Sequence, residues 1–440
     1  MIVSFSIIEK IEVKIFGGIS LKKPELLAPA GSFEKAKVAF LYGADAVYAG
    51  TGKLSLRTRT SMEFDDLVET VKLAHSLNKK VYVAMNVYAR DDEYEQIKEE
   101  AKYLDQLGVD GIIISDGGIV DIVKECAPNT EIHISTQANV TSLHTCNFWY
   151  KNGAKRVILA RELSKDEIKH ITENKPEDLD IEMFVHGAIC YSYSGRCYMS
   201  DYMAGRSANH GDCAQPCRWA YNIYAEEVNK PGEMMPVEYD EKGTYIFSSK
   251  DLCLIKEIPE LFDINVDSLK IEGRLKTEFY LANVVHAYRH ALDDYEKDPE
   301  NWSFEKYFKE LDKARTRGTT AFFFHDKENT DTQDYSGKQY NPDYEFAGIV
   351  VSSDGSADSN VMLDANGSTT IEIRNKLSVG DSLEIMMPDS IEPVEMKIDK
   401  LYDFETGEVI QTVNPGVKEQ KVKLKLPVEV QKGFIIRRVK

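Results

Sequence analysis

The chain has no run approaching the ~20 consecutive apolar residues that a membrane-spanning helix needs, which argues against an integral membrane protein. Its N-terminal stretch is apolar up to Ile8, but Glu9 and Lys10 interrupt it. A secretory signal peptide would also need a basic start and a small-residue cleavage site, and neither is present. We therefore expect a cytoplasmic protein with no membrane partner.

Positive charge is also scarce. The sequence holds 54 lysines and arginines against 73 acidic residues, a formal net charge of -19. Broad attraction to nucleic acid needs a positive face, so the net charge argues against sequence-blind binding, and it does not exclude a local basic groove. The length of 440 residues and an apolar content of 42% allow one large folded domain and a smaller one.

Common hydrolytic motifs are missing as well. The chain contains no Gly-x-Ser-x-Gly elbow and no His-Glu-x-x-His helix motif, and its nine histidines are scattered. A serine or cysteine peptidase needs a nucleophile, a base within hydrogen-bond reach and an oxyanion hole. His186 stands four residues before Cys190 but ends an expected strand. The motifs therefore give hydrolysis little support.

Cysteine is sparse except in one segment. Five of the seven cysteines are Cys190, Cys197, Cys213, Cys217 and Cys253. Such clustering without secretory features indicates a soft-metal site rather than a disulfide framework. A structural zinc site normally has two tight cysteine pairs, and only Cys213 and Cys217 form one. The wider spacings suit an iron–sulfur cluster at least as well, and unliganded thiols are a third interpretation.

Short apolar runs alternate with longer amphipathic runs from Pro24 to about Asp294. Eight strand–helix units over roughly 270 residues predict an α/β fold, a (β/α)8 TIM-barrel-like domain. The expected strands are Leu26–Ala28, Asp45–Ala49, Lys80–Val87, Gly111–Ser115, Glu131–Ser135, Arg156–Ala160, Ile181–His186 and Leu269–Glu272.

The C-terminal part has a different pattern, in which short alternating strands are separated by Gly-Asp and Asn-Gly turns. Such a pattern predicts a small all-β barrel domain. We expect an N-terminal extension over residues 1–23, the barrel over 24–325, a polar linker over 326–345 and the β-domain over 346–440. Its expected strands are Ala347–Ser352, Ser359–Leu363, Thr370–Ile373, Ser382–Met387, Val394–Leu401 and Gln420–Leu426.

Chemistry in such barrels gathers at the C-terminal ends of the strands, and the cysteine-rich segment follows the seventh strand. Glu272 and Arg274 are the strongest catalytic candidates, because they end the eighth strand, which we expect opposite the cysteine segment; His186 is a third candidate. Further polar residues at expected strand ends could line a pocket for an anionic metabolite, since arginine pairs with carboxylates. These candidates are Asn86, Asp116, Gln137, Asn139 and Arg161.

Aromatic residues and arginines interleave along the cysteine-rich segment, where Arg196 is a candidate substrate-binding residue. Flat rings beside guanidinium groups suit an unstacked base, and they suit an ordinary packed loop equally well. The residues concerned are Tyr191, Tyr193, Tyr198, Tyr202, Trp219, Arg196, Arg206 and Arg218.

Several longer motifs make the chain resemble the collagenase-like peptidase family U32. They are Glu182-Met183-Phe184-Val185-His186-Gly187-Ala188-Ile189-Cys190, Ser194-Gly195-Arg196-Cys197, Cys213-Ala214-Gln215-Pro216-Cys217 and Lys270-Ile271-Glu272-Gly273-Arg274. The resemblance covers about residues 24–325, and the segment from Arg374 to Asp381 is similar to the family's small β-barrel.

The resemblance implies two kinds of activity, because the family was named for peptidases while some branches are oxygen-independent hydroxylation factors. The whole-length pattern is most similar to a branch that acts with prephenate in converting the wobble uridine of tRNA to 5-hydroxyuridine. That branch implies a four-iron, four-sulfur cluster on Cys190, Cys197, Cys213 and Cys253, with Cys217 left over. It also implies tRNA, prephenate or a related small carboxylate, and a related family subunit as partners. The alternatives are a collagenase-like peptidase and a non-catalytic binding protein stabilised by zinc.

Overall fold

The computed structural model describes residues 22–51, 62–190, 192–219, 221, 224–226, 231–232, 234–236, 249–314, 317–325, 332, 343–353, 363–364, 366–416 and 420–440. The predicted N-terminal extension lies outside the described residues as far as residue 21. The same holds for most of the predicted linker and for most of the predicted strand Ser359–Leu363.

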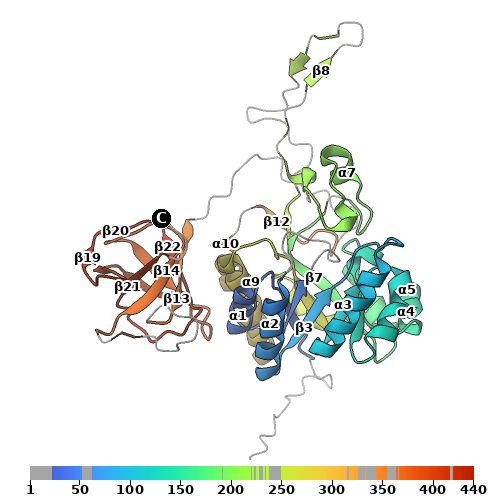
Figure 1. The fold of residues 1–440 in the computed structure, drawn as a ribbon, viewed down its shortest axis with the longest axis horizontal. Helices are drawn as coiled ribbons and strands as arrows, with labels where there is room; N and C mark the ends of the chain where they lie inside the picture. The colour runs from blue at the N-terminus through green and yellow to red at the C-terminus, as the bar shows by residue number, and fades with distance from the viewer. Residues whose placement is uncertain are drawn as a thin grey trace, which may run out of the picture.

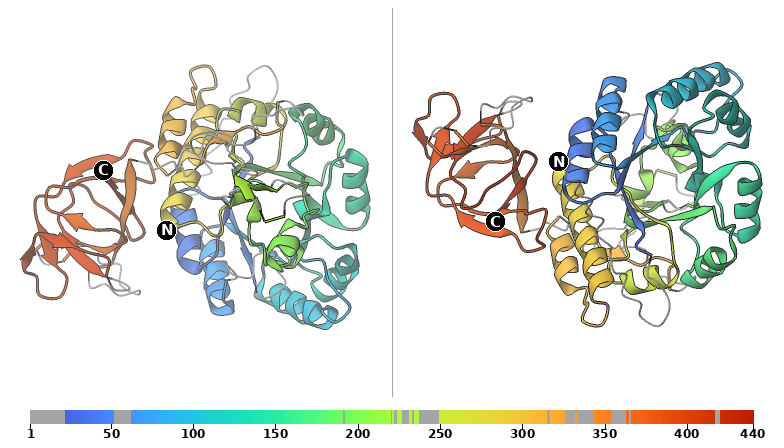
Figure 2. Two further views of the ribbon diagram at one scale, coloured as in Figure 1. Left: turned by 90° about the horizontal axis from the view of Figure 1, so that it is seen from above. Right: turned by 90° about the horizontal axis from the view of Figure 1, so that it is seen from below.

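Eight parallel strands form a closed barrel, because the last of them pairs with both the first and the seventh. Helices surround the strands in a ring, as the two end-on views of Figure 2 show. The barrel strands are β1 (Glu25–Pro29), β2 (Ala46–Gly50), β3 (Lys80–Ala84), β4 (Gly111–Ile114), β5 (Glu131–Ile134), β6 (Ala154–Ile158), β7 (Asp180–Ala188) and β11 (Ser268–Ile271). The predicted (β/α)8 fold is confirmed.

Local sequence explains where the surrounding helices begin. The side chains of Ser32, Ser142 and Thr277 each accept a hydrogen bond from a first-turn N–H of α1, α5 and α9, respectively. The helices of the barrel domain are α1 (Phe33–Leu41), α2 (Phe64–Ser76), α3 (Tyr94–Leu107), α4 (Gly117–Cys126), α5 (Leu143–Lys151), α6 (Lys165–Asn174), α7 (Met199–Ala204), α8 (Ile258–Asp263), α9 (Glu278–Lys297) and α10 (Glu305–Asp312). In the described part of the chain, no helix is long and apolar enough to cross a membrane.

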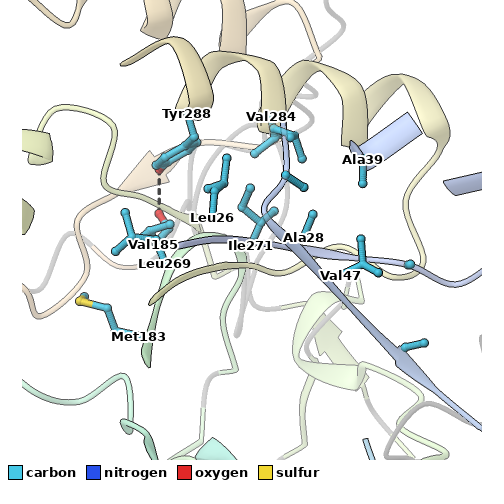
Figure 3. Close-up of a cluster of buried hydrophobic side chains, with 14 of the residues drawn as sticks. Leu26, Ala28, Ala39, Val47, Met183, Val185, Leu269, Ile271, Val284 and Tyr288 are labelled. Atoms are coloured by element: carbon cyan, nitrogen blue, oxygen red, sulfur yellow. Dashed lines mark hydrogen bonds between the residues drawn. The ribbon is translucent and has the colours of Figure 1, made fainter. Parts of the chain in front are cut away.

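The main core lies between the barrel strands and these helices. Figure 3 shows Leu26 of β1 and Leu269 of β11 near Val284 and Tyr288 of α9. The Tyr288 hydroxyl donates to the carbonyl of Val185 at 2.8 Å, so this buried polar atom is satisfied while its ring fills the core. Continuous burial on both faces explains why the strands read as apolar runs.

The barrel interior contains charged residues in addition to apolar ones. Arg156 contacts Glu25 at 2.6 Å and Glu182 at 3.3 Å, and the Lys270 Nζ contacts Glu182 at 2.7 Å. Burial would raise the pKa of Glu182, but Lys270 and Arg156 outweigh that effect and lower it. The interior therefore contains a buried ion-pair network beside its apolar residues.

The C-terminal domain is an antiparallel half-barrel, in agreement with the predicted all-β domain. One predicted strand, Val394–Leu401, is in fact parts of two, and the internal strand β22 (Ile435–Val439) was not predicted. The strands of the C-terminal domain are β13 (Tyr344–Val351), β14 (Thr369–Ile373), β15 (Leu377–Ser378), β16 (Ser382–Ile385), β17 (Val394–Lys397), β18 (Leu401–Asp403), β19 (Val409–Ile410), β20 (Thr412–Val413), β21 (Lys421–Leu424) and β22 (Ile435–Val439).

This domain packs against α9 and α10 of the barrel, beside which it lies in Figure 1. Arg437 of β22 is fully buried; its Nη2 lies 3.0 Å from Glu310 of α10, and its Nε lies 2.7 Å from Glu384 of β16. The Tyr42 hydroxyl donates to the carbonyl of Met386 at 3.1 Å. The β-domain thus lies on one outer side of the helical ring and not over the mouth of the barrel.

Candidate functional site at the mouth of the barrel

The cysteine-rich segment leaves the barrel at the end of β7 and returns through β10 (Asp251–Cys253), which pairs antiparallel with β7. It carries α7 and the short 3-10 turns Ala208–His210 and Pro216–Arg218, and lies beyond the end of the barrel in Figure 1. The expected position on the C-terminal face is confirmed, because the segment directly follows the last residue of β7, Ala188.

Four cysteines of this segment line a single cavity of about 160 Å³. They are Cys190, Cys197, Cys213 and Cys217. Cys190 and Cys213 are exposed, and the other two are half-buried. Thiols that share an accessible cavity form a soft donor set, which suits an iron–sulfur cluster or zinc. We call this space the cysteine cavity.

Backbone contacts hold the wall of the cysteine cavity against the barrel. Gly195 has a φ of +70°, and a Cβ at this position would lie 2.1 Å from the carbonyl oxygen of Gln137, so the close approach requires glycine. The Tyr88 hydroxyl donates to that same carbonyl at 2.5 Å. Ser194 donates to Glu162 through its N–H at 2.7 Å and its hydroxyl at 3.0 Å.

Cys253 does not join the other four cysteines. It is buried on β10 opposite His186, and its thiol lines a separate cavity of about 20 Å³. An ion pair of 3.2 Å between Arg218 and Asp251 links the segments that carry Cys217 and Cys253. The ligand set implied by the resemblance is therefore assembled only in part: three of its members share the cysteine cavity, where Cys217 takes the fourth place.

The side chains of the cysteine cavity match the ligand type of the implied cluster. The cysteine cavity supplies four thiols, the number and type of ligand that a four-iron cluster uses. Among the described residues, no three histidine, cysteine or acidic side chains already converge at metal-binding distances. The chemistry of the cavity fits such a cluster, and the thiols would have to draw together to hold it.

A second cavity of about 90 Å³ opens at the centre of the barrel mouth. Its charged lining consists of Arg161, Lys270, Arg274 and Glu272, three cations and one carboxylate. The Tyr48 hydroxyl lies 3.1 Å from Glu272 Oε2 and can donate to it. We call this space the polar cavity. Its excess of positive charge favours an anionic ligand.

The two cavities adjoin, because Cys190 and Gln137 line both. The expectation that Glu272 lies opposite the cysteine segment is wrong, since β11 pairs directly with β7. The N–H of Glu272 donates to the carbonyl of His186 at 2.8 Å. Gly187, with a φ of +105°, allows this contact, as a Cβ there would lie 2.3 Å from the Glu272 carbonyl oxygen.

The remaining predicted residues divide into two groups. Asn86, Gln137 and Arg161 line the polar cavity, and Arg161 Nη1 donates to the carbonyl of Ala188 at 3.3 Å. Asp116 instead caps α4, accepting from the N–H of Gly118 at 2.8 Å. Neither Asn139, in a left-handed turn, nor the exposed Arg196 is among the described residues that line these two cavities.

His186 was expected to line a polar pocket at the end of its strand, but it lies outside both cavities, although its carbonyl accepts from Glu272. Its ring packs edge-on against Tyr288 of α9 at 5.5 Å and lies 6.1 Å from Tyr280. The pairing register between β7 and β11 shifts between Lys270 and Ile271, so simple alternation along β7 does not predict which way the His186 side chain points. Burial lowers the pKa of His186 to about 4.

Among the residues of the polar cavity that sequence reasoning missed are Tyr48 and Lys270. Both sit inside apolar strand runs, where they resemble core residues. The sequence did hold a clue to Lys270, because a lysine within an otherwise apolar strand needs a charged or polar partner when it is buried. Its Nζ lies 4.3 Å from the centre of the Tyr48 ring, in addition to its ion pair with Glu182.

This arrangement defines a (β/α)8-barrel protein whose functional face is built by a cysteine-rich insertion after β7. The chain belongs to peptidase family U32. Residues 31–334 match the model of that family, and residues 342–437 match the model of the peptidase family U32 C-terminal domain.

Three curated relatives show the range of names within this similarity. The tRNA hydroxylation protein P1 of Bacillus subtilis is 36% identical over 421 residues, which cover 95% of this chain and 96% of the relative. An uncharacterized protease of Methanocaldococcus jannaschii is 40% identical, with coverage of 69% and 73%. A 23S rRNA 5-hydroxycytidine synthase of Escherichia coli is 38% identical, with coverage of 62% of this chain and 40% of the relative.

Proposed function

We propose that this protein is a tRNA-modifying enzyme that hydroxylates the wobble uridine to 5-hydroxyuridine, using an iron–sulfur cluster and prephenate or a related small carboxylate. The observation that carries the proposal is the junction of a thiol-lined cavity and a cationic cavity at the mouth of the barrel. The relative that covers nearly the whole chain is named for tRNA hydroxylation, and a second is named for hydroxylation of a pyrimidine in rRNA.

The cluster would be held by thiolates at the cysteine cavity. Cys190, Cys197 and Cys213 belong both to the cavity and to the set implied by the resemblance, and the fourth ligand is either Cys217 or Cys253. Such a cluster, when bound, supplies one-electron chemistry. The ion pair between Arg218 and Asp251 joins the two segments that compete for the fourth position.

The small carboxylate would occupy the polar cavity. Arg161 and Arg274 present guanidinium groups, which bind carboxylates through paired hydrogen bonds. Lys270 is already paired with Glu182, so it adds charge rather than a primary contact. Glu272, which is oriented by the Tyr48 hydroxyl, is placed to accept a proton from a substrate that enters between the cavities.

A peptidase is the alternative, and one relative carries that name. The structure does pair a cysteine with a histidine, Cys253 with His186, across β10 and β7. Burial raises the pKa of Cys253 to about 11 and lowers that of His186 to about 4, so the pair stays neutral instead of forming a reactive thiolate. Their cavity of about 20 Å³ admits no peptide.

Two further proposals concern what the protein binds, a metal ion and a second subunit, rather than the reaction. Zinc in the cysteine cavity would make the segment a structural element of a binding protein. A related family subunit would remain bound during purification. Metal analysis of the purified protein distinguishes zinc from an iron–sulfur cluster, and mass spectrometry shows whether a related subunit is bound.

Nucleoside mass spectrometry of tRNA tests the proposed function. Deleting the gene should remove 5-hydroxyuridine, and a plasmid-borne wild-type copy should restore it. A Cys197→Ala copy should not restore it. The proposal fails when the nucleoside profile is unchanged in the deletion strain while the purified protein cleaves collagen-derived peptides.

A further inference from the structure

Large aromatic side chains are exposed around the cysteine cavity. Tyr202 is 82% exposed and Tyr198 is 71% exposed, although rings of this size are usually buried in part. The other large exposed side chains of this patch are Tyr193, Met203, Trp219 and Leu275. Tyr193 and Leu275 also line the cysteine cavity, so the patch is continuous with the candidate site. We call these six residues the aromatic rim.

The rim presents flat rings rather than an aliphatic surface. Tyr198 and Tyr202 are four residues apart at and within α7, so their rings lie on the same side of the helix. Trp219 is held in place by its indole N–H, which donates to the carbonyl of Ala214 at 3.2 Å. Exposed rings provide stacking surfaces for unpaired bases.

Charge around the rim differs from that of the whole chain. Residues 192–219 include three arginines and two aspartates, a slight excess of positive charge, whereas the whole chain has a formal net charge of -19. Both aspartates are engaged: Asp212 pairs with Arg206 at 2.6 Å, and Asp201 accepts from the N–H of Ala208 at 3.3 Å. Within the described segments, no carboxylate forms a salt bridge with the exposed Arg196. A phosphate can therefore approach the rim despite the acidic remainder of the protein.

We propose that the aromatic rim binds single-stranded RNA, with unpaired bases of a loop stacked on Tyr198 and Tyr202 and a phosphate beside Arg196, so that the target pyrimidine reaches the junction of the two cavities. This inference rests on the proposed function and deepens it. The substrate is recognised as an open loop, and base-paired RNA is rejected because its bases already stack on one another.

The inference is tested by fluorescence anisotropy with the full-length protein and a synthetic anticodon stem-loop that has uridine at the wobble position. Tyr202→Ala should raise Kd about tenfold, which corresponds to ~1.4 kcal/mol, and Tyr202→Phe should stay near wild type because stacking needs only the ring. Annealing the loop to its complement should abolish binding to the rim. Arg196→Gln should reduce the slope of log Kd against log salt by about 0.7.

Phe148 on α5 is the matched control, because it is 57% exposed and lies outside the rim. Phe148→Ala should leave RNA affinity unchanged. Wild-type RNA affinity in both Tyr198→Ala and Tyr202→Ala overturns the inference. So does the finding that these two variants keep their RNA affinity but no longer bind another protein, because the rim would then be a protein-binding surface. If RNA binding depends on Tyr202 but deletion of the gene leaves tRNA hydroxylation intact, the rim stands and the proposed reaction fails.

Discussion

The N–H of Glu272 donates a hydrogen bond to the carbonyl of His186 at 2.8 Å, which joins the end of β11 to the strand that leads into the cysteine segment. Because of this contact, the strongest catalytic candidate and the first cavity cysteine, Cys190, lie on neighbouring elements and line the same polar cavity. The two kinds of chemistry that the sequence separates by more than fifty residues are thereby brought to one place.

The fourth cluster ligand is decided by a pair of variants. If the cysteine cavity supplies it, Cys217→Ala loses iron and Cys253→Ala retains it. If the resemblance is right, the opposite result follows, and Cys253 must move out of its buried position. Iron analysis after anaerobic purification makes the comparison, with Cys126→Ala on α4 as the control that keeps its iron. Loss of iron in neither variant contradicts both ligand sets.

Replacing Gly195 should disturb the cysteine cavity without touching a thiol. In Gly195→Ala, the new Cβ meets the backbone carbonyl of Gln137, which cannot yield easily, so the wall of the cavity must detach. We expect loss of iron and faster proteolysis of this segment. Gly205→Ala is the control: Gly205 also has a positive φ, +61°, but its surroundings are open, so the change should cost only ~1 kcal/mol and retain iron. Equal iron loss in both variants contradicts the proposed contact.

Glu272→Gln should retain the cluster and lose activity. The substitution preserves size and keeps a hydrogen-bond acceptor for Tyr48, but removes the basic carboxylate from the polar cavity. Loss of a proton acceptor lowers rates by about a hundredfold or more. The ratio of 5-hydroxyuridine to uridine in complemented cells measures the effect. Asp116→Asn, outside both cavities, should leave that ratio unchanged; full activity of Glu272→Gln rules out the proposed role.

Stability should fall in mild acid through His286, a residue of α9 that contacts the carbonyl of Met387 in the β-domain. Burial, followed by the neighbouring His290, lowers the pKa of His286 from 6.5 to about 4. Since the unfolded chain takes up this proton first, stability is complete above pH ~6.5 and declines as pH falls toward 4, by up to ~1.4 kcal/mol per pH unit. Urea unfolding at pH 7 and pH 5 should show about 2 kcal/mol more loss for wild type than for His286→Gln. An equal loss would contradict this assignment.

Much of the fold could be predicted, because each barrel strand is a short apolar run between amphipathic helices. β22 was not predicted because Arg437 stands in its middle, and the carboxylates of Glu310 on α10 and Glu384 on β16 that stabilise this buried arginine come from other elements. Local sequence patterns do not reveal partners that lie 127 and 53 residues away along the chain.

The candidate site was predicted in part for a similar reason. Spacing identified the cysteines, but it could not say that β10 turns Cys253 away from the cavity that Cys217 joins. Lys270 looked like an interruption of a core strand, because its partner Glu182 lies on β7, a distant part of the sequence. Asp116 was predicted as a site residue because it follows a strand, where active sites often place an aspartate. Aspartate is also favoured as the residue that caps the start of the next helix, and that is the role it has here.

The most direct test of the account is the analysis of iron, zinc and acid-labile sulfide in the anaerobically purified wild-type protein, together with its absorption spectrum. The account predicts a brown protein with iron and sulfide in near-equal amounts, and the loss of both in Cys197→Ala. Tightly bound zinc without sulfide would contradict it.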